Sequence, residues 1–69
     1  MEEFTLRLKE LRTAKRLSQQ QLAKEIGVGR SSITYWEMGE KIPSAQAIVT
    51  LARYFGVTTD YLLGESDIK

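Results

Sequence analysis

The sequence SQQQLAKEIGVGRSSITYWEMG, at positions 18–39, decides the fold that we expect of this chain. Ser18 followed by Gln21 is the pattern of a capping box, in which the serine oxygen accepts a backbone N–H and the glutamine side chain reaches back. An apolar stripe at helical spacing then follows, formed by Leu22, Ala23 and Ile26. These signals predict a helix with Ser18 as its N-cap.

A tight turn and a second helix come next. Gly27 stands where the first helix has to stop in a left-handed conformation, which glycine adopts without the steric penalty of a Cβ atom. The second helix is expected to begin near Gly29 or Arg30, to run to Met38 and to be closed by Gly39.

The two faces of this second helix differ in chemistry. Ile33 and Trp36 are three residues apart and form the inward face, with Trp36 interpreted mainly as a core residue. The opposite face carries the hydrogen-bonding side chains of Arg30, Ser31, Thr34 and Tyr35. Helices joined by so short a turn cross steeply, and the small Ala23 lets their backbones approach. This pattern predicts a helix-turn-helix whose second helix suits a DNA major groove.

The chain resembles the Cro/C1-type (XRE) helix-turn-helix family of phage repressors and bacterial regulators. The similarity extends from about Leu8 to Leu63, and it is carried by Leu17-Ser18-Gln19, Leu22-Ala23, Ile26-Gly27-Val28, Ile33, Trp36-Glu37, Gly39 and Pro43. The resemblance implies an all-α, compact five-helix lambda-repressor-like DNA-binding domain, in which helices 2 and 3 form the helix-turn-helix.

Three further helices complete the expected fold. A helix near residues 2–15 has one apolar stripe, formed by Phe4, Leu8 and Leu11. Ser44 is expected to cap a fourth helix with a stripe formed by Ile48, Leu51, Ala52 and Phe55. A fifth, short helix is expected from Thr58 or Thr59 to Leu63. In the loop before the fourth helix, Ile42 is expected to plug the core.

Length and composition limit the possible classes of protein. The 69 residues are expected to form one DNA-binding domain at positions 1–64, followed at 65–69 by a frayed polar tail or the start of a linker. There is no cysteine or histidine, so we expect no disulfide, metal site or cofactor. No stretch resembles a membrane span or a signal peptide, so we expect a soluble, cytoplasmic protein without a membrane partner. No small-molecule ligand is indicated.

The net charge of only +1 is weak support for a nucleic-acid partner. Residues 1–17 are the most basic part, with five basic and three acidic side chains. Phosphate binding is therefore expected to depend on backbone N–H groups, helix N-termini and polar side chains as well as on lysine and arginine.

The expected base contacts lie on the second helix of the motif. Arg30 is long, charged and in the first turn, and its fork suits guanine O6 and N7, although a grip on phosphate alone stays open. Ser31 matches a base-contacting position of the family. Tyr35 is expected to press against a thymine methyl group or to bond a phosphate. Thr34 is the remaining candidate, with phosphate contact or simple exposure as alternatives.

The expected phosphate contacts surround that helix. Gln19 matches the family glutamine that contacts phosphate and braces a side chain of the reading helix. Gly29 departs from the common serine or threonine cap, and its bare N–H is free to approach DNA. Ser32 and Lys41 are the other candidates, Lys41 in the loop that follows the motif.

Charged residues on the first helix are mostly expected to have structural or surface roles. By resemblance, Arg12 pairs with Glu37 and so joins the helix near residues 2–15 to the second helix of the motif, since a carboxylate beside phosphates would be repulsive. Arg7 is interpreted as part of a solvated helix face. Lys15 and Arg16, close to the start of helix 2, leave a phosphate contact open.

The leading hypothesis is a sequence-specific regulator of transcription, with a repressor favoured, that binds double-stranded operator DNA as a homodimer. A single domain of this size makes few contacts, so two copies on a pseudo-palindrome are expected, with half-sites ~34 Å apart. By resemblance, Tyr61 and Leu63 are candidates for the dimer contact, whereas Leu62 is interpreted as core.

Two other classes are weighed against this one. An antitoxin-type or protein-interaction module would use the same fold, and the low net charge leaves that alternative open. An enzyme is excluded, because Ser31 and Ser32 have no evident general base and no carboxylate pair lies beside a pocket-forming motif.

Overall fold

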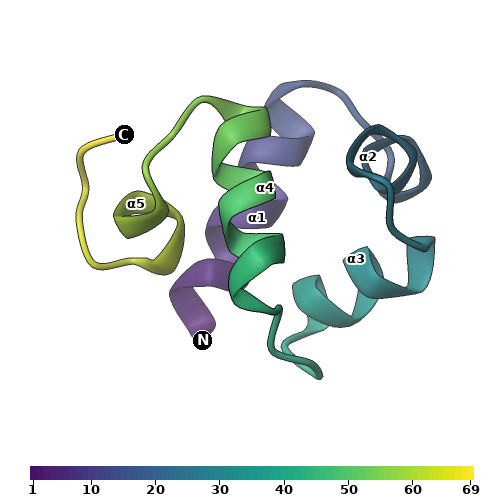
Figure 1. The fold of residues 1–69 in the computed structure, drawn as a ribbon, viewed down its shortest axis with the longest axis horizontal. Coiled ribbons are helices and arrows are strands. Elements are labelled where there is room, and N and C mark those ends of the chain that lie inside the picture. Colours follow the sequence, from purple (N-terminus) through teal and green to yellow (C-terminus); the bar gives the residue numbers. More distant parts are fainter.

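The computed structural model describes all residues, 1–69, and contains five α-helices and no strand (Figure 1). The helices are α1 (Glu2–Ala14), α2 (Gln19–Ile26), α3 (Arg30–Met38), α4 (Ala45–Phe55) and α5 (Thr59–Leu63). The all-α, five-helix architecture expected from the sequence is confirmed, with helix ends within about one residue of those expected. None of these helices combines the length and apolar character that crossing a membrane requires.

Local sequence signals determine the two ends of α2. At its start the Ser18 side chain accepts the Gln21 N–H at 3.0 Å, and the Gln21 side chain accepts the Ser18 N–H at 2.7 Å. At its end Gly27 adopts a left-handed conformation with φ of +77°. This conformation reverses the chain, so that Val28 packs against the core and α3 begins within three residues.

One hydrophobic core joins all five helices. Its six largest fully buried side chains include at least one from each helix: Phe4, Leu8, Leu22, Ile33, Leu51 and Leu62. Trp36 is only 8% exposed, and the small Ala23 is buried beside α3's inner face. The interpretation of Trp36 and Leu62 as core residues is therefore confirmed.

The expectation that Ile42 plugs the core is wrong. Its side chain is 78% exposed, and Pro43 is the loop residue that is buried instead. Pro43 directly precedes the N-cap Ser44, and an apolar residue at that position packs toward the fourth residue of the helix, here Ile48. Because neighbouring residues of an extended loop point in opposite directions, burial of Pro43 turns Ile42 outward.

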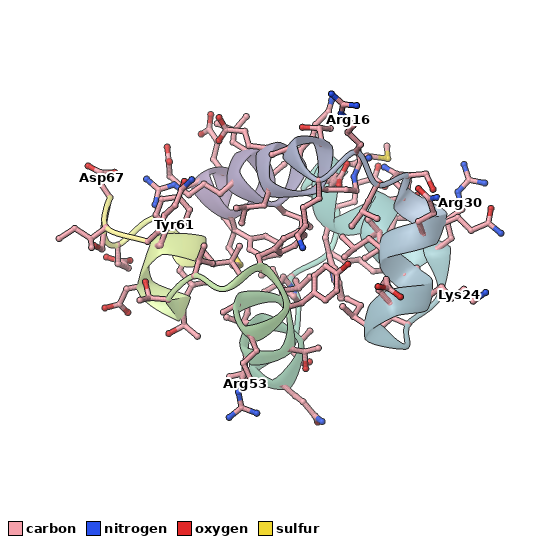
Figure 2. The ribbon with its side chains drawn as sticks, turned by 90° about the horizontal axis from the view of Figure 1, so that it is seen from above. Arg16, Lys24, Arg30, Arg53, Tyr61 and Asp67 are labelled. Atoms are coloured by element: carbon pink, nitrogen blue, oxygen red, sulfur yellow. The ribbon has the colours of Figure 1, made fainter.

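The interpretation of Arg7 as a solvated residue is also wrong. The Arg7 side chain is only 12% exposed. Its guanidinium donates to the backbone oxygens of Tyr61 and Ser66 and, at 2.7 Å, to the Asp67 carboxylate. The C-terminal segment thus folds back onto α1 and α5, at the end of the molecule opposite Arg30 (Figure 2).

Candidate nucleic-acid interface

Helix α3 separates core residues from polar residues on two faces. Ile33 and Trp36 point inward, while Arg30, Ser31 and Tyr35 are exposed. Together with Thr34, the three exposed residues line a shallow hollow of about 300 Å³ on the outer face of the helix. The structure therefore brings together all four residues that were expected to contact bases.

Arg30 is an arginine without a partner in the protein. No protein acceptor takes a hydrogen bond from its guanidinium, and no carboxylate lies within ion-pair distance. It projects from the surface (Figure 2) at the first position of α3. A cation at a helix N-terminus is disfavoured by the helix dipole. Stability therefore gives no reason for an arginine here, whereas a guanine edge or a phosphate would.

The N-terminus of α3 is open to an anion. Gly29 is its N-cap and provides no side-chain hydrogen bond. A Cβ atom at Gly29 would meet only the Ser31 hydroxyl, at 3.8 Å, so lack of space does not explain the glycine. The first backbone N–H groups of a helix have no acceptor within it. Phosphate oxygens suit such groups, and Ser32 lies half-buried in this turn.

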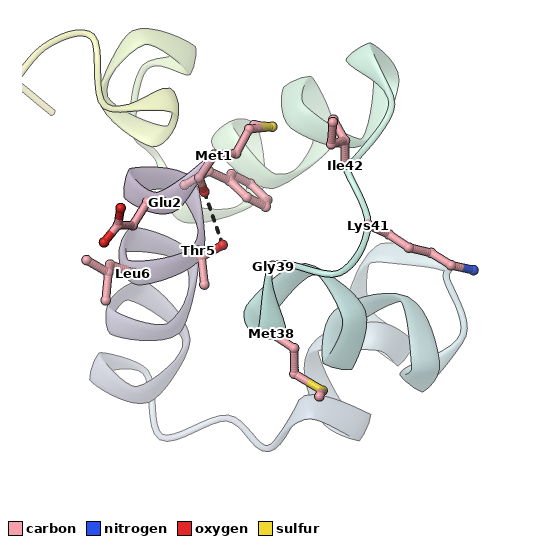
Figure 3. A pocket seen from close by; sticks show the side chains of 9 residues that line it. Met1, Glu2, Thr5, Leu6, Met38, Gly39, Lys41 and Ile42 are labelled. Atoms are coloured by element: carbon pink, nitrogen blue, oxygen red, sulfur yellow. Dashed lines mark hydrogen bonds between the residues drawn. The ribbon is translucent and has the colours of Figure 1, made fainter.

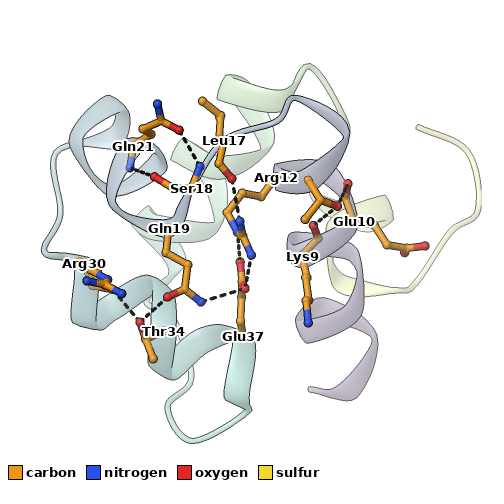
Figure 4. A network of polar contacts seen from close by, with 11 residues as sticks. Lys9, Glu10, Arg12, Leu17, Ser18, Gln19, Gln21, Arg30, Thr34 and Glu37 are labelled. Carbon is orange, nitrogen blue, oxygen red and sulfur yellow. Dashed lines mark hydrogen bonds and ion pairs between the residues drawn. The ribbon is translucent and has the colours of Figure 1, made fainter.

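A polar network links α3 to α1 and α2 (Figure 4). Arg12 and Glu37 form a bidentate pair, with Nε to Oε2 at 2.6 Å and Nη2 to Oε1 at 2.9 Å. The remaining guanidinium nitrogen of Arg12, Nη1, donates to the Leu17 carbonyl at 2.7 Å. Only 12% of the Arg12 side chain and 5% of the Glu37 side chain are exposed. The ion pair expected from the resemblance is thus present, and it joins α1 to α3.

The pair affects the protonation of Arg12. Hydrogen bonding to Glu37 raises the pKa of the Arg12 guanidinium above its ordinary value, more than partial desolvation lowers it, and Coulomb attraction to the same carboxylate adds to the rise. Arg12 therefore stays charged at every accessible pH, and Glu37 points toward Arg12 and not toward the outer face of α3.

Gln19 links this network to the outer surface. Its side-chain oxygen accepts from the Thr34 hydroxyl at 2.8 Å, and its amide nitrogen donates to Glu37 at 3.1 Å. An amide nitrogen carries two hydrogens, so one donor stays available for a phosphate. The single hydroxyl proton of Thr34 is directed to Gln19 at 2.8 Å, with the Arg30 carbonyl as a second, longer acceptor at 3.3 Å. The hydroxyl therefore has no further proton to donate, and its lone pairs and the methyl group are what remain.

One contact of the interface was not predicted from the sequence. The Lys41 ammonium lies 4.5 Å from the centre of the Tyr35 ring. The two residues were assigned separate roles, because a loop residue six positions after a helical one gives no sequence signal of contact.

The residues expected at a dimer contact lie far from this interface. The Tyr61 ring has the Arg7 guanidinium at 4.2 Å on it and the Lys69 ammonium at 5.6 Å. Leu63 is half-buried and packs against the core. Part of the surface expected for a partner is therefore in contact with the chain's own residues. No group of three acidic, histidine or cysteine side chains is arranged to hold a metal ion.

Comparison with known proteins agrees with this geometry. Residues 8–62 match the family described as helix-turn-helix. The chain is similar to the HTH-type transcriptional activator BcrR of Enterococcus faecalis, with 38% identity over 66 residues. That match covers 96% of this chain and 32% of BcrR. The chain also spans only about half to three-fifths of several other curated relatives.

Two solved structures share the fold. The restriction-modification controller protein C.AhdI from Aeromonas hydrophila is 39% identical, with a TM-score of 0.80 over 88% of this chain and 92% of that one. The P22 c2 repressor protein, solved in complex with a synthetic operator, is 26% identical. Its TM-score is 0.86 over 96% of this chain and all of the repressor chain.

Proposed function

The chain belongs to the Cro/C1-type helix-turn-helix family, and from this premise we propose that it is a sequence-specific DNA-binding regulator of transcription. The members of this family and the relatives named above are DNA-binding regulators and not enzymes, so Ser31 and Ser32 have no catalytic role. In the proposed complex α3 enters the major groove of double-stranded DNA.

The observation that carries this proposal is the outer face of α3. It presents a guanidinium, a hydroxyl and a phenol that form no hydrogen bond with any other protein group. Arg30 is proposed to read a guanine through O6 and N7, with Ser31 and Tyr35 on neighbouring base edges and Thr34 beside them. The inner face, by contrast, is fully used by the core and by the Gln19–Glu37–Arg12 network.

Phosphate contacts are proposed to hold this helix in register. The candidates are Gln19 through its second amide hydrogen, Gly29 through its N–H, Ser32 in the first turn, and Lys41 in the following loop. Contacts of this kind position a protein on DNA without reading its sequence. With so few cations, we expect a shallow salt dependence, equivalent to about two to four neutralised phosphates per protomer.

The proposal includes two protomers on a pseudo-palindromic operator. One domain of this size buries too little surface for tight specific binding, and half-sites about one helical turn apart would double the contacts. Tyr61 and Leu63 remain the proposed dimer contacts. Repression is the proposed outcome, because occupying an operator can block transcription without any further surface. Residues 1–64 are proposed as the DNA-binding domain.

Selection from a random oligonucleotide library, followed by sequencing, tests the proposal. The wild-type chain should enrich one motif, and two-fold symmetry in that motif would support the dimer. Arg30→Ala should lose about 1–3 kcal/mol of binding free energy and relax selection at one base pair. Arg53→Ala is the matched control, because this exposed arginine lies on α4 and points away from Arg30 (Figure 2).

Two outcomes would contradict the proposal. If Arg30→Ala selected the same motif with the same strength, the assignment of the reading residue would be wrong. If the wild-type chain enriched no motif at all, an antitoxin-type or protein-interaction module would become the better account.

A further inference from the structure

The Lys41 side chain points away from a pocket that lies beside it. A pocket of about 350 Å³ separates the start of α1 from the loop after α3, with Met1, Met38 and Ile42 among its lining residues. Figure 3 shows the Lys41 side chain directed out of this pocket. Its ammonium instead sits over the Tyr35 ring, at 4.5 Å from the ring centre.

The Tyr35 ring has no other polar contact to fix it. The residue is 36% exposed, and its hydroxyl forms no hydrogen bond within the protein. The cation over its face is thus the polar contact that favours this orientation of the ring, by a factor of about two to five for a pair near the surface.

The ring forms one wall of the hollow on the outer face of α3. The other lining residues are Arg30, Ser31 and Thr34, so Tyr35 supplies the aromatic surface among polar neighbours. In the major groove, the C5-methyl group of thymine is the one apolar feature that a base pair presents. An aromatic wall beside hydrogen-bonding groups matches a pyrimidine carrying that methyl group.

We propose that Lys41 is a positioning residue for base reading: it holds the Tyr35 ring as the wall against which the C5-methyl group of a pyrimidine packs. This inference rests on the proposed function. A lysine ammonium has three donors, so Lys41 can hold a phosphate while it lies over the ring. The grip on the DNA backbone and the reading of one base are then coupled through a single side chain.

Replacement of each thymine of the selected motif by deoxyuridine tests the inference, because this removes only the methyl group. Wild-type binding should fall about two- to tenfold at one position of each half-site. Tyr35→Ala should not distinguish thymine from uracil there, whereas Tyr35→Phe should, since the ring and not the hydroxyl makes the contact.

Lys41→Ala is the decisive variant. It should weaken binding to both oligonucleotides and also bring the thymine-to-uracil ratio at that position about two- to fivefold closer to one. Lys41→Arg should restore the ratio, because a guanidinium also binds an aromatic face. Lys9→Ala, an exposed lysine on α1, is the control and should leave the ratio unchanged.

The outcomes separate this inference from the function on which it rests. Equal weakening of both oligonucleotides by Lys41→Ala, with the ratio intact, would reduce Lys41 to a phosphate contact and overturn the inference. A motif with no methyl-sensitive thymine would also overturn it, while sequence-specific binding itself stood. If the wild-type chain selected no DNA sequence at all, the proposed function itself would be refuted.

Discussion

Two arginines at opposite ends of the molecule have opposite surroundings. At one end, Arg7 is nearly buried and donates to two backbone oxygens and the Asp67 carboxylate, with Tyr61 against its plane. At the other, Arg30 is exposed and donates to no protein group. We call the first region, α1 with α5 and residues 64–69, the anchored end, and the outer surface of α3 the reading face.

On the proposed function, this difference separates residues that stabilise the fold from residues that bind DNA. Where the chain supplies acceptors, an arginine joins elements that are far apart in sequence. Where it supplies none, the donors stay open to a ligand. Substitutions at the anchored end and in the supporting network should therefore change folding, and those at the reading face should change binding with little effect on folding.

The largest effect is expected in the network that lies between the two regions. Glu37→Leu removes the carboxylate and leaves the Arg12 guanidinium nearly buried without its partner, which should cost about 3 kcal/mol of unfolding free energy. Urea unfolding followed by circular dichroism measures this. Part of the loss should be recovered in the double variant Arg12→Met/Glu37→Leu, since no uncompensated charge then remains. If Glu37→Leu alone were as stable as the wild type, the Arg12–Glu37 pair would not stabilise the contact between α1 and α3.

Arg7→Ala should have the next largest effect. It removes three hydrogen bonds from a charged, nearly buried donor, so we expect a loss of about 1–2 kcal/mol in unfolding free energy. Residues 65–69 should detach, with backbone order parameters falling below ~0.6 in NMR relaxation. Arg53→Ala, at an exposed site on α4, is the control for both readouts. A tail that stayed ordered in Arg7→Ala would mean that Arg7 does not anchor it.

The features predicted from sequence patterns are local, and the contacts of Arg7 that were missed join residues far apart in the chain. Apolar spacing and cap residues are local signals, so the five helices, the core residues that the helices contribute and the turn of the motif were predicted correctly. The Arg12–Glu37 pair came from the family resemblance. The contacts of Arg7 join residues 54 to 60 positions apart, and no local pattern contains such information.

At the reading face, too, the sequence predicted which residues are exposed but not how they contact one another. Its polar residues were identified from their helical spacing, because the core residues Ile33 and Trp36 fix which side of α3 faces outward. The contact between Lys41 and Tyr35 was not identified. It depends on the path of the loop after Gly39, which also buries Pro43 and exposes Ile42.

Gly29→Ser should make the reading face more stable. A serine N-cap improves on glycine by a few tenths of a kcal/mol, and replacing glycine at a φ of −75° reduces the entropy of the unfolded chain, for a total gain of about 0.5–1 kcal/mol. The new hydroxyl would accept from the N–H of Ser31 or Ser32 and so compete with phosphate for that group, and DNA affinity should fall slightly. Thermal unfolding and a binding titration on one preparation test the two signs. A gain in both would mean that the N–H groups of Ser31 and Ser32 do not bind phosphate.

The smallest effect on folding is expected at Arg30, and its sign is informative. Arg30→Ala removes a cation from the N-terminus of α3 and introduces the best helix former, so unfolding free energy should rise by about 0.3 kcal/mol. Gln20→Ala, an exposed change at the start of α2, is a matched control for the effect of alanine alone. Greater stability together with weaker DNA binding would mean that this position is occupied for recognition at the expense of the fold. A loss of stability would instead mean that Arg30 has a partner within the protein, and the contrast with Arg7 would not hold.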